Sequence, residues 1–221
     1  MCTRNLLPGA RLVPAIALFA VLIATTAAVS TKSKRDGFAF QDGDVVFQGH
    51  MSGQGAAIAQ ATHSPYTHCG IVFLENGVPM VWEAVGPVKR TPWKEFMHHG
   101  EGDHYVIKRV RDPLASSEVS ELKKAGTAMM GLPYDNHFQM DDERIYCSEL
   151  VFKMFSAAGR SVGTLERFCD MDLEAPIAHR ALVERFGGAV PCDSKVITPA
   201  ALFRAAELVT VDSVGAPPRI P

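Results

Sequence analysis

The fold of this chain is decided by residues 145–152, which are Ile145-Tyr146-Cys147-Ser148-Glu149-Leu150-Val151-Phe152. A polar, turn-rich run precedes them. After them, apolar residues recur at helical spacing, which predicts that a helix begins at or next to Cys147. The unpaired N–H groups and positive dipole end of a helix start favour an anion, so the Cys147 thiol should ionise readily. We interpret Cys147 as a nucleophile.

A thiolate nucleophile needs a proton acceptor, and the predicted one is His68, on a strand expected over residues 67–74. The pair Asn76-Gly77 lies between two apolar runs, which strongly indicates a two-residue hairpin turn. In that register His68 and Glu83 share one face as diagonal neighbours across Gly70, which takes no room. Glu83 would then orient the imidazole and stabilise its charged form. A loop one residue longer would move Glu83 to the opposite face.

Each of these three residues also has an ordinary interpretation. A cysteine near a helix start is often a small buried hydrophobe, a strand histidine often belongs to the core, and a strand glutamate usually faces water. Metal binding is a rival use of the same groups, but no CxxC or HExxH spacing is present. We therefore expect no metal and no other cofactor.

The remaining pattern alternates between the two types of secondary structure and predicts an α+β domain. We expect strands over residues 44–48, 67–74, 80–85, 87–90, 103–110 and 208–211, and helices over residues 49–61, 117–130, 147–158, 177–186 and 199–207.

The composition limits the possible partners. The formal net charge is −2 with 47% hydrophobic residues, and no lysine or arginine stripe appears. Such a chain can build a core of ordinary size but lacks the electrostatic surface of a nucleic-acid binder.

The N-terminal segment is predicted to direct export. Arg4 and Arg11 form a basic start, an apolar run follows, and small residues precede position 29. We interpret residues 1–28 as a signal peptide, because the apolar run is shorter than the roughly 20 residues of a spanning helix. The alternative is an uncleaved anchor, which would be the chain's membrane contact. Residues 29–37 would be a linker, 38–212 the domain and 213–221 a flexible tail, in an exported protein that is periplasmic or envelope-associated.

Four cysteines follow the predicted signal peptide: Cys69, Cys147, Cys169 and Cys192. Cys169 and Cys192 could form a disulfide in an oxidising compartment, or remain as two partly buried thiols. The sequence does not decide between these alternatives.

Five blocks of sequence, in order, resemble the YiiX-like permuted papain-fold amidases, which are relatives of NlpC-type cysteine peptidases and of the lecithin retinol acyltransferase group. The blocks are GDVVFQ (43–48), THSPYTHCGIV (62–72), EAVGPV (83–88), GLPYD (131–135) and YCSELV (146–151). The permutation agrees with the chain order, since His68 precedes Cys147 whereas papain-like enzymes have the nucleophile first.

The resemblance implies an antiparallel, barrel-like sheet packed against the helix that bears Cys147. It also implies Cys147 as nucleophile, His68 as general base and Glu83 as orienting acid. Cys69 stands where an aliphatic residue is usual, and strand alternation would point it away from the site into the core.

Several further residues are candidates for the site. The Cys147 backbone N–H and the side chain of Gln48 or Tyr66 are candidate oxyanion donors. Tyr134, Asp135 and Tyr146 are candidates for the pocket lining.

The function we expect is hydrolysis of an amide, in a short peptide or an amino-acid amide, through a thioester. A cell-wall peptide would suit the export signal. The alternatives are a lipid-acting thiol hydrolase or acyltransferase that uses the same residues, and a non-catalytic envelope binding protein. In each enzymatic case the partner is a small peptide, amino-acid amide or acyl substrate, and not a nucleic acid.

Overall fold

The structure is a computed structural model and describes residues 34–35 and 38–221. The predicted signal peptide and most of the predicted linker lie outside these residues. Within the described part of the chain, no helix combines the length and the apolar character needed to cross a membrane.

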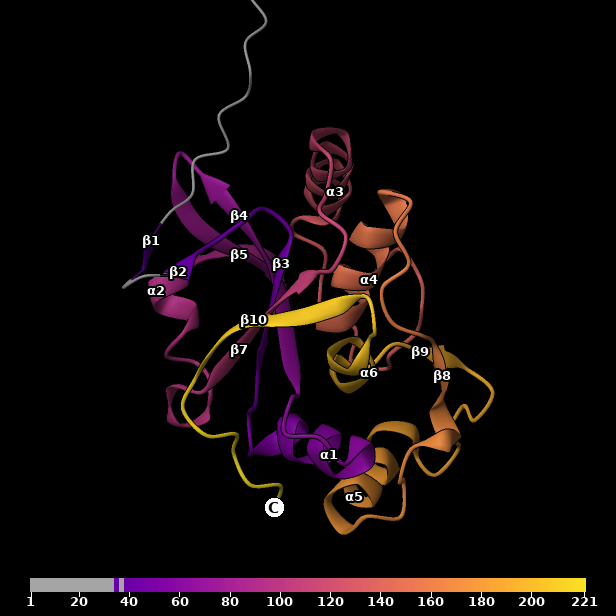
Figure 1. The fold of residues 1–221 in the computed structure, drawn as a ribbon. Coiled ribbons are helices and arrows are strands. Elements are labelled where there is room, and N and C mark those ends of the chain that lie inside the picture. The colour runs from indigo at the N-terminus through magenta and orange to yellow at the C-terminus, as the bar shows by residue number, and fades with distance from the viewer. Residues whose placement is uncertain (1–33, 36–37) are drawn as a thin grey trace, which may run out of the picture. The chain divides into compact units, whose positions relative to one another are not determined.

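The centre of the domain is a six-stranded antiparallel sheet with the strand order β10-β7-β3-β4-β5-β6 (Figure 1). Its strands are β3 (Asp44–Gln48), β4 (His68–Glu75), β5 (Val78–Ala84), β6 (Val88–Pro92), β7 (Tyr105–Val110) and β10 (Leu208–Val214). Two short pairs lie apart from it and consist of β1 (Lys34–Arg35) with β2 (Phe38–Ala39), and β8 (Glu166–Arg167) with β9 (Lys195–Val196). The predicted antiparallel sheet is confirmed, and its strands lie close to the predicted ranges.

The β4–β5 hairpin has the register that the sequence predicts. Val72 pairs with Val81 and Glu75 with Val78, so the loop consists of Asn76 and Gly77 alone. Both loop residues have positive φ, 51° and 81°, as a tight primed turn requires. This turn fixes which side chains of the two strands share a face.

The helices are α1 (Gly53–Thr62), α2 (Trp93–Phe96), α3 (Ser116–Met129), α4 (Cys147–Ala157), α5 (Pro176–Phe186) and α6 (Pro199–Arg204), with 3-10 turns at Glu101–Asp103 and Phe168–Asp170. Helix α6 begins as predicted, since Thr198 Oγ1 accepts a hydrogen bond from the Ala201 N–H at 2.9 Å. It ends three residues earlier than expected.

Helix α4 packs on strands β4 and β5 through its apolar face. Leu150, Val151, Met154 and Phe155 are buried in one cluster with Cys69, Ile71 and Phe73 of β4 and with Trp82 and Ala84 of β5. The intervening residues, Val72 and Val81, belong to a second cluster on the other face of the sheet, together with Trp93 and Phe96 of α2. By alternation, His68 and Glu83 belong to this second face.

Helices α1 and α5 pack against each other below the sheet in Figure 1, and the C-terminus lies beside α1. The segment predicted as a flexible tail begins within strand β10. Strand β10 continues past the predicted boundary, because Ser213 and Val214 pair with β7 after a bulge. At the end of the chain, Gln60 Nε2 donates a hydrogen bond to the Pro221 carbonyl at 2.8 Å.

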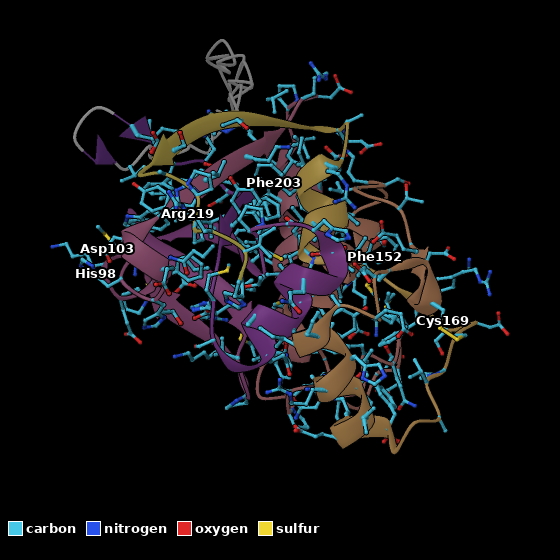
Figure 2. All side chains as sticks on the ribbon, turned by 90° about the horizontal axis from the view of Figure 1, so that it is seen from below. His98, Asp103, Phe152, Cys169, Phe203 and Arg219 are labelled. Carbon is cyan, nitrogen blue, oxygen red and sulfur yellow. A yellow bond between two sulfur atoms is a disulfide. The ribbon has the colours of Figure 1, made fainter. Side chains whose placement is uncertain are left out.

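Cys169 and Cys192 form a disulfide, which decides between the alternatives that the sequence left open. Cys169 lies at the periphery of the molecule in Figure 2, next to the β8–β9 pair. Cys69 and Cys147 are both free and buried.

Candidate active site

Cys147 is the first residue of α4, as the sequence predicts. The preceding residue, Tyr146, has extended backbone geometry, and its N–H donates to Glu149 Oε2 at 3.3 Å. Because Glu149 binds the N–H of the residue before the helix, the N–H groups of the first turn remain available at Cys147. The sulfur therefore lies at a helix start, where the first N–H groups have no partner within the helix.

His68 and Glu83 meet as the hairpin register predicts. His68 Nε2 lies 2.7 Å from Glu83 Oε2, and both side chains are buried. The second carboxylate oxygen, Glu83 Oε1, accepts a hydrogen bond from Thr91 Oγ1 at 2.5 Å. Glu83 is thus held on both sides, and its hydrogen bond fixes the orientation of the imidazole ring.

Cys147 and His68 lie close enough to interact, although their positions in the sequence differ by 79. Because Nε2 is bound to Glu83, Nδ1 is the ring nitrogen left to face the sulfur. Burial alone would lower the pKa of His68, but the hydrogen bonds with Cys147 and Glu83 outweigh it and raise that pKa to about 10. The resting histidine is therefore an imidazolium at neutral pH.

The Cys147 sulfur is correspondingly a thiolate. A hydrogen bond from the Cys69 thiol has the largest effect on the pKa of Cys147 and lowers it. His68 and the Cys69 backbone N–H lower this pKa further. Together they lower the pKa of Cys147 well below its usual range, against the opposing effect of burial. Cys147 and His68 therefore form a buried ion pair, the activated state of a cysteine nucleophile.

The position of Cys69 partly corrects the expectation for it. Its side chain belongs to the core cluster beneath α4, as alternation predicts. Its thiol nevertheless contacts Cys147, so it does not point away from the site. Helix α4 packs on the face of β4 that bears Cys69. Its first residue, Cys147, interacts with both His68 and Cys69, the first two residues of that strand.

Tyr134 also lies next to Cys147. Its hydroxyl lies close enough to Cys147 to interact with it, and it accepts a hydrogen bond from Gln54 Nε2 at 3.1 Å. Burial raises the pKa of Tyr134 well above its usual range, so the hydroxyl keeps its proton. Tyr134 can therefore donate a hydrogen bond to an oxygen that develops charge next to the sulfur.

The two predicted oxyanion side chains, Gln48 and Tyr66, are placed differently. Gln48 pairs with His68 across β3 and β4, but its Nε2 donates to the Phe96 carbonyl at 2.9 Å. Tyr66 stacks on Phe203 with ring centroids 3.9 Å apart, within the core cluster. Neither side chain lines the pocket at Cys147. The structure thus places neither of them at the pocket, whereas Tyr134 lines it.

Asp135 and Tyr146 support the loop before α4. Asp135 is buried, and its carboxylate accepts hydrogen bonds from the backbone N–H groups of His137 and Gln139. The Tyr146 hydroxyl accepts a hydrogen bond from the Ile197 N–H at 3.1 Å. Of these two, Tyr146 lines the pocket, and Asp135 lies behind it.

A pocket of about 650 Å³, including its open mouth, reaches Cys147. Helices α1 and α5 and the loops around Tyr134 and Ile197 form its walls. Its lining is mainly aliphatic and aromatic, as in Ile58, Phe138, Phe168, Leu173, Leu182 and Val196. Arg185 of α5 is the cationic side chain among these lining residues. The site can therefore hold an apolar group against the sulfur.

Sequence reasoning missed Thr91, Gln54 and Arg185. Thr91 could have been found, because it lies on the same face of β6 as Glu83 does on β5 once Val81 pairs with Thr91. Gln54 and Arg185 come from helices α1 and α5, which no local pattern connects with Cys147. Their positions depend on how these helices pack.

Known proteins resemble this chain over most of its length. Residues 39–212 match the family described as "Permuted papain-like amidase enzyme, YaeF/YiiX, C92 family". The chain is 41% identical over 172 residues to the uncharacterized protein YiiX of Escherichia coli (strain K12), an alignment that covers 77% of this chain and 85% of that protein. It also resembles the crystal structure of a protein described as metalloprotein yiiX from Escherichia coli O157:H7. That match has a TM-score of 0.76 and 40% identity, and it covers 79% of this chain and 97% of the other.

Proposed function

Because the chain belongs to the family of permuted papain-like amidases, we propose that it is a cysteine amidase whose nucleophile is Cys147. In this proposal His68 carries protons and Glu83 orients His68. The observation that carries it is the unbroken line of contacts from Cys147 to His68 to Glu83, at one end of a pocket that the sulfur lines. Nucleophile, base and orienting group in hydrogen-bonding order are the signature of this chemistry.

In the acylation step, the Cys147 thiolate attacks the carbonyl carbon of the substrate amide. The tetrahedral intermediate carries its negative charge on oxygen, where the Cys147 backbone N–H and the Tyr134 hydroxyl can donate to it. The C–N bond then breaks, and the imidazolium of His68 gives its proton to the leaving nitrogen. The product is a thioester on Cys147 and a neutral His68.

In the deacylation step, neutral His68 takes a proton from a water molecule, whose oxygen attacks the thioester. The C–S bond breaks, the acid leaves, and the thiolate–imidazolium pair is restored. Glu83 favours this pair, because its carboxylate stabilises the charged imidazole. Thr91 holds Glu83 in place through the short hydrogen bond to Oε1.

The pocket lining bears on the substrate. A mainly aliphatic and aromatic surface next to the nucleophile suits an apolar acyl group better than a polar peptide. This favours the lipid-acting alternative, an enzyme that cleaves an N-acylated amide or transfers its acyl group. Short peptides, including cell-wall peptides, and amino-acid amides are the rival substrates.

No metal takes part in the proposed mechanism. The related protein of known structure is described as a metalloprotein. In the present chain, no three His, Cys, Asp or Glu side chains among the described residues are grouped so as to hold a metal ion. The side chains at the site interact with one another instead, Cys147 with His68 and His68 with Glu83. The proposed mechanism therefore contains no step through a metal.

We also propose that the protein is exported, to the periplasm or the envelope. The basic and apolar pattern of residues 1–28 supports this, and so does the disulfide between Cys169 and Cys192, since disulfides persist mainly in oxidising compartments. Detection of the mature protein in a periplasmic fraction, with its N-terminus determined by mass spectrometry, tests the proposal.

The amidase proposal is tested with a substrate panel and a thiol probe. The purified protein is assayed against N-acyl amides, short peptides, amino-acid amides and lipid esters, and the acyl-enzyme is sought by mass spectrometry. We expect an adduct on Cys147, and we expect the Cys147→Ala variant to lose turnover while it keeps its circular dichroism spectrum. If Cys147 reacts with iodoacetamide no faster than Cys69 and no substrate is turned over, a binding protein is the better description.

A further inference from the structure

Arg185 carries a positive charge in a pocket whose lining is mainly apolar. It belongs to α5, and its guanidinium lies 5.2 Å from the centroid of the Phe138 ring. Its surroundings are costly for a cation, and burial lowers the pKa of Arg185 below its usual value. A partly buried cation without a paired carboxylate is an unusual component of a pocket wall unless a ligand supplies the opposite charge.

Among the described residues, Arg185 has no carboxylate partner of the kind that several other arginines have. Carboxylate oxygens lie within 3.1 Å of the guanidinium groups in the pairs Arg109–Asp44, Arg160–Glu118 and Arg204–Glu166. Among residues 34–35 and 38–221, no carboxylate oxygen lies within 4.0 Å of Arg185. Asp135 is near enough to interact with Arg185 through its charge, but its two oxygens accept the N–H groups of His137 and Gln139.

A single amide group connects Arg185 with the nucleophile's surroundings. Gln54 Oε1 accepts a hydrogen bond from Arg185 Nη2 at 2.9 Å, and Gln54 Nε2 donates to the Tyr134 hydroxyl at 3.1 Å. Tyr134 in turn lies next to Cys147. All four residues line the same pocket. Arg185, Gln54 and Tyr134 thus form a polar strip that leads to the sulfur along an apolar wall.

We infer that Arg185 binds the anionic group, a carboxylate or a phosphate, of an acyl substrate whose apolar part occupies the pocket. This inference rests on the proposed amidase function and adds a substrate class to it. The scissile carbonyl lies at Cys147 with its oxygen near Tyr134, and the anion lies at the other end of the strip. The planar guanidinium fork suits either anion, and Gln54 holds it in position.

The test compares substrates that share a dodecanoyl amide and differ in charge. N-dodecanoylglycine carries a carboxylate, N-dodecanoyl phosphoethanolamine a phosphate, and N-dodecanoylglycinamide is neutral. The proteins are the wild type, Arg185→Ala, Arg185→Lys and the control Arg180→Ala, which changes an exposed arginine of the same helix. Dissociation constants are measured in parallel on Cys147→Ala protein with and without Arg185→Ala.

We expect the wild type to prefer at least one anionic substrate over the neutral one by tenfold or more in kcat/KM. Arg185→Ala should lower kcat/KM for that substrate by about 10- to 100-fold, mostly through KM, since a charged hydrogen bond is involved. The same variant should change kcat/KM for the neutral substrate by less than about threefold. Arg185→Lys should recover part of the loss, and Arg180→Ala should resemble the wild type. The preferred anion identifies carboxylate or phosphate as the source.

The outcomes distinguish a failure of the anion site from a failure of the proposed amidase function. Turnover of all three amides at similar rates, unchanged by Arg185→Ala, overturns the anion site and leaves the amidase intact. Absence of turnover, with binding of an anionic amide that depends on Arg185, supports the anion site and counts against hydrolysis of these amides. Absence of both turnover and Arg185-dependent binding overturns the inference.

Discussion

His68 Nε2 and Glu83 Oε2 lie 2.7 Å apart because Gly70 leaves room between them. A Cβ atom on Gly70 would lie 2.5 Å from Val81 Cγ1 and 3.3 Å from Glu83 Cβ. The pairing of histidine and glutamate thus depends on a glycine that contributes no side chain. Its consequences can be measured.

Gly70→Ala is expected to lower both stability and activity. The added methyl group forces β4 and β5 apart at a buried position, which should cost about 1–3 kcal/mol in the free energy of unfolding. The same displacement lengthens the His68–Glu83 contact, so kcat should fall even where the variant is folded. Urea denaturation and steady-state kinetics check this prediction. An unchanged free energy of unfolding and an unchanged kcat would show that the two strands accommodate the methyl group without moving apart.

Replacing His68 should lower activity more than replacing Glu83. His68→Ala removes the proton carrier, and we expect kcat/KM to fall by about 10²–10⁴-fold. Glu83→Gln keeps a side chain that can still hold the ring, so its loss should be at least about tenfold smaller. Both are compared on one substrate after circular dichroism shows that the variants are folded. Equal losses would mean that Glu83 does more than orient the ring.

Thr91→Val should show how much turnover depends on holding Glu83 in place, while the proton-carrying residue His68 is unchanged. It removes the hydroxyl that donates to Glu83 Oε1 but nearly preserves the volume. Because the buried carboxylate loses one donor, stability should fall by about 1–3 kcal/mol. Turnover should fall less than in Glu83→Gln, since the bond between His68 and Glu83 remains. A loss of turnover as large as that of His68→Ala would contradict this role.

The pH profile of kcat/KM should be a broad bell. As the pH rises through about 10, His68 loses the proton that the leaving nitrogen needs, so the rate should fall there. On the acid side, the pKa of Cys147 is lowered by the Cys69 hydrogen bond and by His68, so the rate should persist below neutral pH until the sulfur is protonated. An acid limb near pH 8.5, where an ordinary thiol ionises, would disagree with the ion pair.

Cys69 should act on the nucleophile through its thiol. In Cys69→Ala the donor to the Cys147 sulfur is lost, so the pKa of Cys147 should rise and the acid limb of its alkylation should move to higher pH. In Cys69→Ser a hydroxyl replaces the thiol as donor, so the limb should stay nearer to that of the wild type. Iodoacetamide labelling followed by mass spectrometry measures this. If the acid limb of Cys147 alkylation lies at the same pH in Cys69→Ala and in the wild type, Cys69 does not affect the pKa of Cys147.

The sequence by itself determined those parts of the protein that depend on neighbours along the chain. The Asn76-Gly77 turn sets the β4–β5 register, and side-chain alternation then brings Glu83 to His68. The start of α4 at Cys147 follows from the apolar spacing after it. These features are local, so periodicity and turn chemistry are sufficient to predict them.

Only the tertiary structure decided what surrounds the sulfur. Cys69 contacts Cys147 because α4 packs on one particular face of β4. Arg185 and Gln54 line the same pocket because α1 packs against α5, far from Cys147 in sequence. Such contacts result from many weak side-chain interactions summed over the whole core, and no short stretch of sequence contains that sum.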